Sequence, residues 1–325
     1  MTTAAKVSRH LVDPQLQPLL EMMPETELTV EYLPQMRASA MTFPASPESV
    51  AKVIQFERTV PGPNGAPDVP VRCYRPKDAA GPLPCIFHIH GGGYIGGSAA
   101  QMEASHVELS LALTCAIVSV DYRLAPEAAY PAAVEDCYAA LAWLHAEPTV
   151  AGVDTARLGV MGESAGGGLA AALALLVRDR GEYAFSFQHL VYPMLDDRTS
   201  AEGAADPHPY AGEFIWTHSS NRFGWRSLLG AEPGGADVSP YAAPARAPDL
   251  AGLPPTFIMA GALDLFLEED MDYARRLTRA GVPVELHVYP GGVHAFDFVP
   301  GLEISEQARR DSLASLRRAM RASLP

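Results

Sequence analysis

The chain has 325 residues, of which 48% are hydrophobic and 19% charged, and its formal net charge is −14. This composition excludes a disordered chain, and the acidic balance, with no cluster of Lys and Arg before the last helix-like stretch, excludes nucleic acid as a partner. No apolar run is long enough to span a membrane and the first residues lack the apolar core of a signal peptide, so we expect a cytoplasmic protein without a membrane partner.

The N-terminal residues 1–45 show helical periodicity before any strand of a sheet is predicted. From Val71 onward, short apolar runs alternate with helical patterns. The predicted strands are 72–76, 85–90, 116–122, 158–163, 187–193, 256–261 and 284–290. The predicted helices are 101–114, 132–146, 165–180, 266–280 and 303–323. Apolar strands that are each followed by a helix indicate an α/β fold, with a mostly parallel sheet covered on both faces.

One segment interrupts this alternation. Residues 196–252 are rich in Pro, Gly, Ala and aromatic residues, and they are too many for a plain connection between two strands. We therefore expect a helical cap formed by residues 1–45 and 196–252, over a catalytic domain of residues 46–195 and 253–325. The aromatic residues of the insertion either hold it onto the body or line a pocket, and the sequence leaves both roles open for Phe214, Trp216, Phe223 and Trp225.

The four cysteines show no C-x-x-C spacing, and three of them lie within apolar elements. A reduced cysteine in such a place behaves as a small hydrophobic residue. We expect buried, inert thiols rather than a disulfide or a zinc site at Cys73, Cys85, Cys115 and Cys137.

The segment "GESAG" at residues 162–166 has the pattern G-x-S-x-G. An apolar strand precedes it and an Ala- and Leu-rich helix follows, so Ser164 is predicted at a tight strand-to-helix turn with its hydroxyl above the sheet. The flanking glycines are needed because larger side chains would collide with the neighbouring strand and helix. This is the arrangement of a nucleophilic serine.

A serine hydroxyl needs a base within hydrogen-bonding distance and a third group that orients the base. His294 follows the last predicted strand, and Asp264 follows the strand before it, so both are expected at the same sheet edge as Ser164. The chain order Ser164, Asp264, His294 is that of the α/β hydrolases. Glu268 lies close enough in the sequence to be an alternative acid.

The stretch "HIHGGGYIGGS" at residues 88–98 has five glycines directly after a predicted buried strand. Backbone N–H groups without neighbouring side chains can approach a developing oxyanion unhindered. We predict an oxyanion hole formed by the N–H groups of Gly92, Gly93 and Ala165. We expect a structural role for His90 and a bracing ion pair between Asp121 and Arg123.

The sequence resembles the bacterial hormone-sensitive-lipase-like esterases, a branch of the α/β-hydrolase superfamily. The resemblance covers about residues 70–300 and is carried by "HGGGY" at 90–94, "DYRLAPE" at 121–127, "YPAAVEDC" at 130–137, "GESAGGG" at 162–168 and "GGVHAF" at 291–296. It implies a carboxylesterase that acts on short acyl esters, has a cap, uses no cofactor and frequently forms a homodimer.

The chain departs from the family pattern at the acid and before the nucleophile. The family commonly has Pro directly after the acid and Arg two positions beyond that Pro, where this chain has Leu265 and Leu267, and Glu163 stands where Asp or Thr is frequent. An amidase or a specific deacetylase would use the same three residues, and a binding protein could use the same scaffold. A lipase would need an exposed apolar platform, for which the composition gives no evidence.

Overall fold

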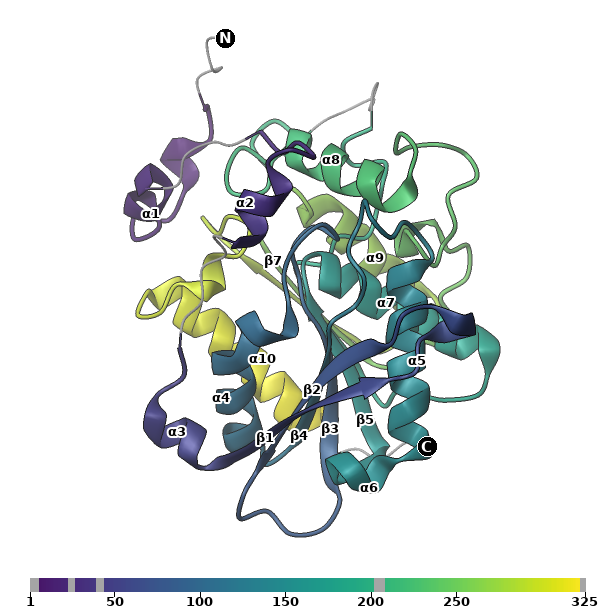
Figure 1. Cartoon of the computed structure of the whole chain (residues 1–325). Helices are drawn as coiled ribbons and strands as arrows, with labels where there is room; N and C mark the ends of the chain where they lie inside the picture. The colour runs from purple at the N-terminus through teal and green to yellow at the C-terminus, as the bar shows by residue number, and fades with distance from the viewer. Residues whose placement is uncertain (1–5, 23–26, 39–43, 202–207, 322–325) are drawn as a thin grey trace.

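The structure, a computed structural model, describes residues 6–22, 27–38, 44–201 and 208–321. Its core is an eight-stranded sheet in the order β1-β2-β4-β3-β5-β6-β7-β8 (Figure 1). The strands are β1 (Val53–Val60), β2 (Val69–Pro76), β3 (Leu83–Ile89), β4 (Ala116–Val120), β5 (Val153–Glu163), β6 (Gln188–Val191), β7 (Thr256–Gly261) and β8 (Val284–Tyr289). Strand β2 pairs antiparallel with β1 and β4, and all other neighbouring strands are parallel, so the predicted α/β fold with a mostly parallel sheet is confirmed.

Strand β1 was not predicted from the sequence. It lies at the edge of the sheet, and most of its residues are exposed or half-buried. A strand that faces solvent lacks the continuous apolar run by which the buried strands are found.

The helices cover both faces of the sheet (Figure 1). One face carries α4 (Glu103–Leu113) and α10 (Glu303–Ala319), with α3 (Pro47–Ala51) beside α4. The other carries α5 (Ala132–Ala146), α6 (Pro148–Ala151), α7 (Ala165–Arg180) and α9 (Leu267–Arg279). Two hydrophobic clusters fill these layers, and successive residues of β3 alternate between them: Phe87 lies in one and Ile86 in the other.

Two parts of the chain lie beyond the carboxyl ends of the parallel strands, at the top of Figure 1. The N-terminal segment contains α1 (Gln17–Met22) and α2 (Leu33–Ala38), and the insertion between β6 and β7 contains α8 (His218–Leu229). The N-terminal segment contacts the loop after β8, where the Asp13 N–H donates to the Gly291 carbonyl over 3.0 Å. Both parts therefore lie at the edge of the sheet where Ser164 is found.

Candidate active site

Ser164 occupies the turn between β5 and α7, with backbone angles φ 55° and ψ −122°. A non-glycine residue is strained in this region, and such strain is typical of functional sites. A Cβ at Gly162 would lie 2.2 Å from the Gly166 carbonyl oxygen, and a Cβ at Gly166 would lie 2.1 Å from that of Ile89. Both glycines are thus required for strand and helix to meet at this sharp turn.

The three side chains predicted to act together lie in a row, each within hydrogen-bonding distance of the next. Ser164 Oγ is 2.9 Å from His294 Nε2, and His294 Nδ1 is 2.8 Å from Asp264 Oδ2. Asp264 is fully buried, whereas Ser164 and His294 keep 7% and 6% of their surface exposed. All three side chains are therefore buried, and only the carboxylate end of the line is fully enclosed.

The local fold supports Asp264 rather than Glu268 as the acid. Asp264 follows β7, and its Oδ1 accepts the N–H of Phe266 over 3.0 Å, which fixes the carboxylate. Glu268, in the first turn of α9, is exposed to solvent. Leu265 and Leu267, at the positions where the chain departs from the family pattern, are both buried. The chain thus has buried apolar side chains at the two positions after the acid where the family has Pro and Arg.

Aromatic rings surround the imidazole of His294. Tyr192 and Phe266 meet it edge-on, with ring centroids 4.9 and 5.2 Å away, and the Trp216 centroid is 6.3 Å away. The Tyr192 hydroxyl donates to Asp297 over 2.8 Å, and burial raises the pKa of Asp297 to about 6. Tyr192 and Asp297 were not predicted as site residues, although Tyr192 lies near the carboxyl end of the predicted strand 187–193, at the edge where Ser164 lies.

The glycine loop approaches the nucleophile closely. A Cβ at Gly91 would lie 2.8 Å from the Glu163 carbonyl oxygen and 3.4 Å from the Ser164 Cβ. Gly92 and Gly93 follow with φ of 120° and 62°, which L-residues with a side chain rarely adopt. Ala165 is the first residue of α7, and the first N–H groups of a helix have no partner within it. The loop and the helix start thus both lie next to the Ser164 turn.

The neighbouring His90 has structural contacts, as predicted. Its Nδ1 lies 2.8 Å from the Gly91 carbonyl oxygen, and its ring stacks on Tyr122 at a centroid distance of 4.3 Å. The Tyr122 hydroxyl donates to the His90 carbonyl over 2.9 Å. Burial lowers the pKa of His90 to about 4, so the imidazole is neutral near pH 7.

The predicted ion pair between Asp121 and Arg123 is wrong. The Arg123 guanidinium instead binds both oxygens of Asp136, a fully buried residue of α5, at 2.7 and 2.8 Å. Asp121 accepts the N–H of Ala99 over 2.6 Å. The helix presents a carboxylate edge that matches the planar guanidinium, and this long-range contact cannot be found from sequence neighbours.

Glu163 belongs to a buried polar cluster beneath the turn. Its two carboxylate oxygens lie 2.9 and 3.1 Å from His88 Nε2, and His88 Nδ1 lies 3.1 Å from Ser119 Oγ. The sequence left the role of Glu163 open and did not single out His88. The sequence did contain a signal for His88: it lies two residues before His90 on the predicted strand 85–90, so the two histidines share one face of that strand.

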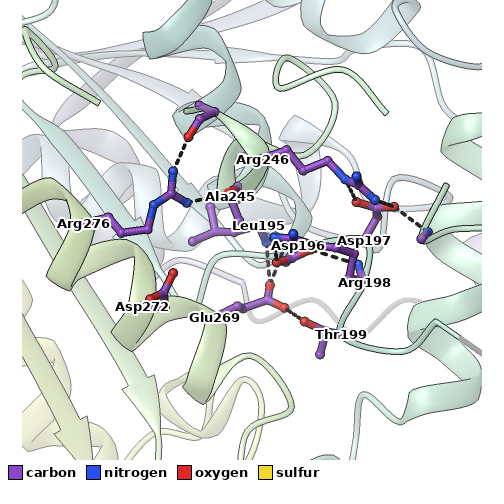
Figure 2. A network of polar contacts seen from close by, with 12 residues as sticks. Leu195, Asp196, Asp197, Arg198, Thr199, Ala245, Arg246, Glu269, Asp272 and Arg276 are labelled. Atoms are coloured by element: carbon purple, nitrogen blue, oxygen red, sulfur yellow. Dashed lines mark hydrogen bonds and ion pairs between the residues drawn. The ribbon is translucent and has the colours of Figure 1, made fainter. Parts of the chain in front are cut away.

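A second polar network ties the start of the insertion to α9 (Figure 2). Glu269 accepts the N–H groups of Leu195 and Asp196 over 2.6 and 3.2 Å and the hydroxyl of Thr199. Burial raises the pKa of Glu269 well above its ordinary range. The buried Asp197 binds Arg246 through two hydrogen bonds of 2.5 and 2.8 Å. The helix that follows Asp264 thus also anchors the insertion.

The aromatic residues of the insertion, for which the sequence left two roles open, differ in what they contact. Trp225 is fully buried and packs against Tyr94, with centroids 5.3 Å apart. Phe214 is buried, and Phe223 packs against a small cluster that includes Leu33 of α2. Trp216 instead lies against the glycine loop, since a Cβ at Gly93 would be 2.2 Å from its Cη2 atom. Trp216 thus stands beside both the loop and His294.

The cysteines are free and buried, as predicted. Burial raises the pKa of Cys73 and of Cys115 to about 12, so these thiols stay protonated and unreactive. Within the described parts of the chain, no group of three or more His, Cys, Asp or Glu residues is placed to hold a metal ion. Over the same residues, no helix has the length and apolar character that crossing a membrane would require.

Known proteins show the same sequence pattern and fold. The family model described as alpha/beta hydrolase fold matches residues 86–298. Carboxylesterase NlhH of Mycobacterium tuberculosis is 35% identical over 98% of this chain and 100% of its own. The structure titled "Bacterial Heroin Esterase" is 37% identical, covers 97% of this chain and 100% of its own, and gives a TM-score of 0.88. The structure of esterase LipW from Mycobacterium marinum is 33% identical, with 98% of both chains covered and a TM-score of 0.82. The chain therefore belongs to the α/β-hydrolase family, in its branch of hormone-sensitive-lipase-like esterases.

Proposed function

We propose that this carboxylic ester hydrolase is a serine esterase that hydrolyses short acyl esters through an acyl-enzyme. The observation that carries the proposal is the continuous contact from Ser164 Oγ to His294 Nε2 and from His294 Nδ1 to Asp264 Oδ2. Relatives that span the whole chain and are named carboxylesterase or esterase support the same chemistry.

The geometry supports the following steps. Nδ1–H of His294 donates to Asp264, which leaves the Nε2 lone pair facing the Ser164 hydroxyl. His294 removes the hydroxyl proton as Oγ attacks the ester carbonyl carbon, and Asp264 stabilises the imidazolium. When the tetrahedral intermediate collapses, His294 gives this proton to the leaving alcohol. Water then attacks the acyl group with the same base, and free acid and serine are released.

The oxyanion of the intermediate is assigned to the N–H groups of Gly92, Gly93 and Ala165. Donors that are already oriented stabilise charge that develops only in the transition state. The close approach of Gly91 to the Ser164 turn and the left-handed backbone of Gly93 support this assignment.

Replacing Gly93 with alanine is expected to lower kcat about 10²- to 10³-fold, the usual effect of losing one oxyanion donor. The new Cβ would meet Trp216 at 2.2 Å and favour a different φ from the observed 62°. Gly81→Ala is the matched control, because Gly81 also has a positive φ, of 72°, but has nothing within 4 Å of a new Cβ. Steady-state rates with p-nitrophenyl butyrate check this, and equal rates for the two variants would contradict the assignment.

Trp216 is proposed to limit the size of the substrate, because its indole occupies the space beside Gly93 and His294. Trp216→Ala should raise kcat/KM for a p-nitrophenyl ester with a longer or branched acyl group, relative to the acetate, by about 10-fold. Trp143→Ala removes the same side chain from α5 and should leave the ratio unchanged. An unchanged ratio in the Trp216 variant would show that the indole lies outside the substrate pocket.

A chain-length series of p-nitrophenyl esters, with a matched anilide, tests the substrate class. The proposal predicts the highest kcat/KM for a short acyl ester and slower hydrolysis of the anilide. Faster hydrolysis of the anilide would favour an amidase, and a jump in rate above the solubility limit of a long-chain ester would favour a lipase.

A further inference from the structure

Arg37 reaches from the N-terminal segment to the body of the protein. It lies in the last turn of α2, and its Nε donates to the Ile95 carbonyl over 2.7 Å while Nη2 donates to the Ala125 carbonyl over 3.0 Å. Nη1 and Nη2 also bind both oxygens of Glu127, at 2.8 and 2.9 Å. A single guanidinium thus joins α2 to two separate loops of the body.

The two carbonyls belong to the backbone network that shapes the glycine loop. The N–H of Ile95 donates to the Gly92 carbonyl over 3.1 Å, and the N–H of Ala125 donates to the Tyr94 carbonyl over 2.9 Å. Arg37 therefore binds the carbonyl groups of Ile95 and Ala125, the same two residues whose N–H groups bind the Gly92 and Tyr94 carbonyls. Tyr94 has a φ of 66°. This backbone conformation is energetically unfavourable for a residue with a large side chain, so it persists only where the surrounding structure holds it.

The contact requires the shape of a guanidinium. Its planar fork can bind two carbonyl groups and a carboxylate at once, whereas a lysine ammonium is a compact charge on a flexible stem. Glu127 is largely exposed, so we assign it to orienting the fork rather than to a strong ion pair. Apolar contacts among Leu33, Met36 and Ile95 also bind α2 to the loop, so α2 has a means of staying docked without the guanidinium.

We propose that Arg37 is a positioning residue that couples the N-terminal segment to the oxyanion loop. By binding Ile95 and Ala125 it fixes the orientation of the Gly92 and Gly93 peptides, so the donors are oriented only while α2 is docked. This inference rests on the proposed function, because it assigns to the loop the role of receiving the oxyanion.

The test compares Arg37→Gln and Arg37→Lys with Arg9→Gln, a control that removes an exposed arginine paired with Glu21 in the same N-terminal segment. For each protein, kcat and KM for p-nitrophenyl butyrate are measured per active site titrated with a fluorophosphonate. Inhibition by an alkyl trifluoromethyl ketone, which forms a tetrahedral adduct with a nucleophilic serine, and the melting temperature are measured alongside.

Both Arg37 variants should lose about 10- to 100-fold in kcat, and their inhibition constants for the ketone should rise by the same factor. KM should change less than about threefold, and the Arg9 variant should match the wild type. An unchanged kcat and inhibition constant in Arg37→Gln, or a kcat restored fully by lysine, would overturn the proposal. If the ketone fails to inhibit the wild type, the proposed function fails instead, so the two failures are distinguishable.

Discussion

Ser164→Ala is expected to reduce kcat for p-nitrophenyl butyrate by roughly 10⁴- to 10⁶-fold. The variant has no hydroxyl to attack the carbonyl carbon, while His294 and the glycine loop remain. The residual rate should reflect substrate binding and oxyanion stabilisation alone, so KM should change little. Removing one hydroxyl from a turn held by the Gly162 and Gly166 contacts should leave the fold intact.

The measurement is steady-state hydrolysis together with thermal unfolding, and Ser219→Ala is the matched control because Ser219 is an exposed serine of the inserted helix α8. The control should hydrolyse the ester like the wild type. If the Ser164 variant retained the wild-type rate, Ser164 could not be the nucleophile.

The second large effect is expected from Asp264→Asn. The asparagine amide would donate a hydrogen bond to Nδ1 and favour the tautomer with its proton on Nε2, so the imidazole could no longer accept the serine proton. In a serine protease this substitution lowers kcat about 10⁴-fold while the geometry stays intact, and we expect a loss of the same order here.

Glu268→Gln is the control for the acid, because Glu268 was the alternative in the sequence and is exposed on α9. Its kcat should stay within about twofold of the wild type, as surface substitutions away from special features have small effects. A large loss in Glu268→Gln together with a small loss in Asp264→Asn would reverse the assignment.

The parts of the site that depend on local chain geometry could be predicted from the sequence. Ser164 was found because glycines, an apolar strand and an Ala-rich helix specify a sharp turn within a few residues. Asp264 and His294 were found because the ends of neighbouring parallel strands meet at one edge of a sheet. In both cases the position follows from secondary structure alone.

The parts that depend on packing between distant elements could not be predicted. Arg123 binds Asp136 instead of its near neighbour Asp121, since the packing of α5 decides which carboxylate faces the guanidinium. Arg37 likewise reaches loops 58 and 88 residues away along the chain. Such contacts have no local pattern, because long charged side chains lie in many places in a sequence and pair only after the elements have packed.

Treatment with diethyl p-nitrophenyl phosphate, followed by intact mass measurement and tryptic mapping, tests the central claim most directly, since this reagent phosphorylates activated serines. The expected result is one diethylphosphoryl group per chain, on the peptide 158–178 that contains Ser164, with parallel loss of esterase activity. The Ser164→Ala protein should gain no mass. Loss of activity with the label on another residue, or full activity after stoichiometric labelling of Ser164, would contradict a mechanism in which Ser164 attacks the ester.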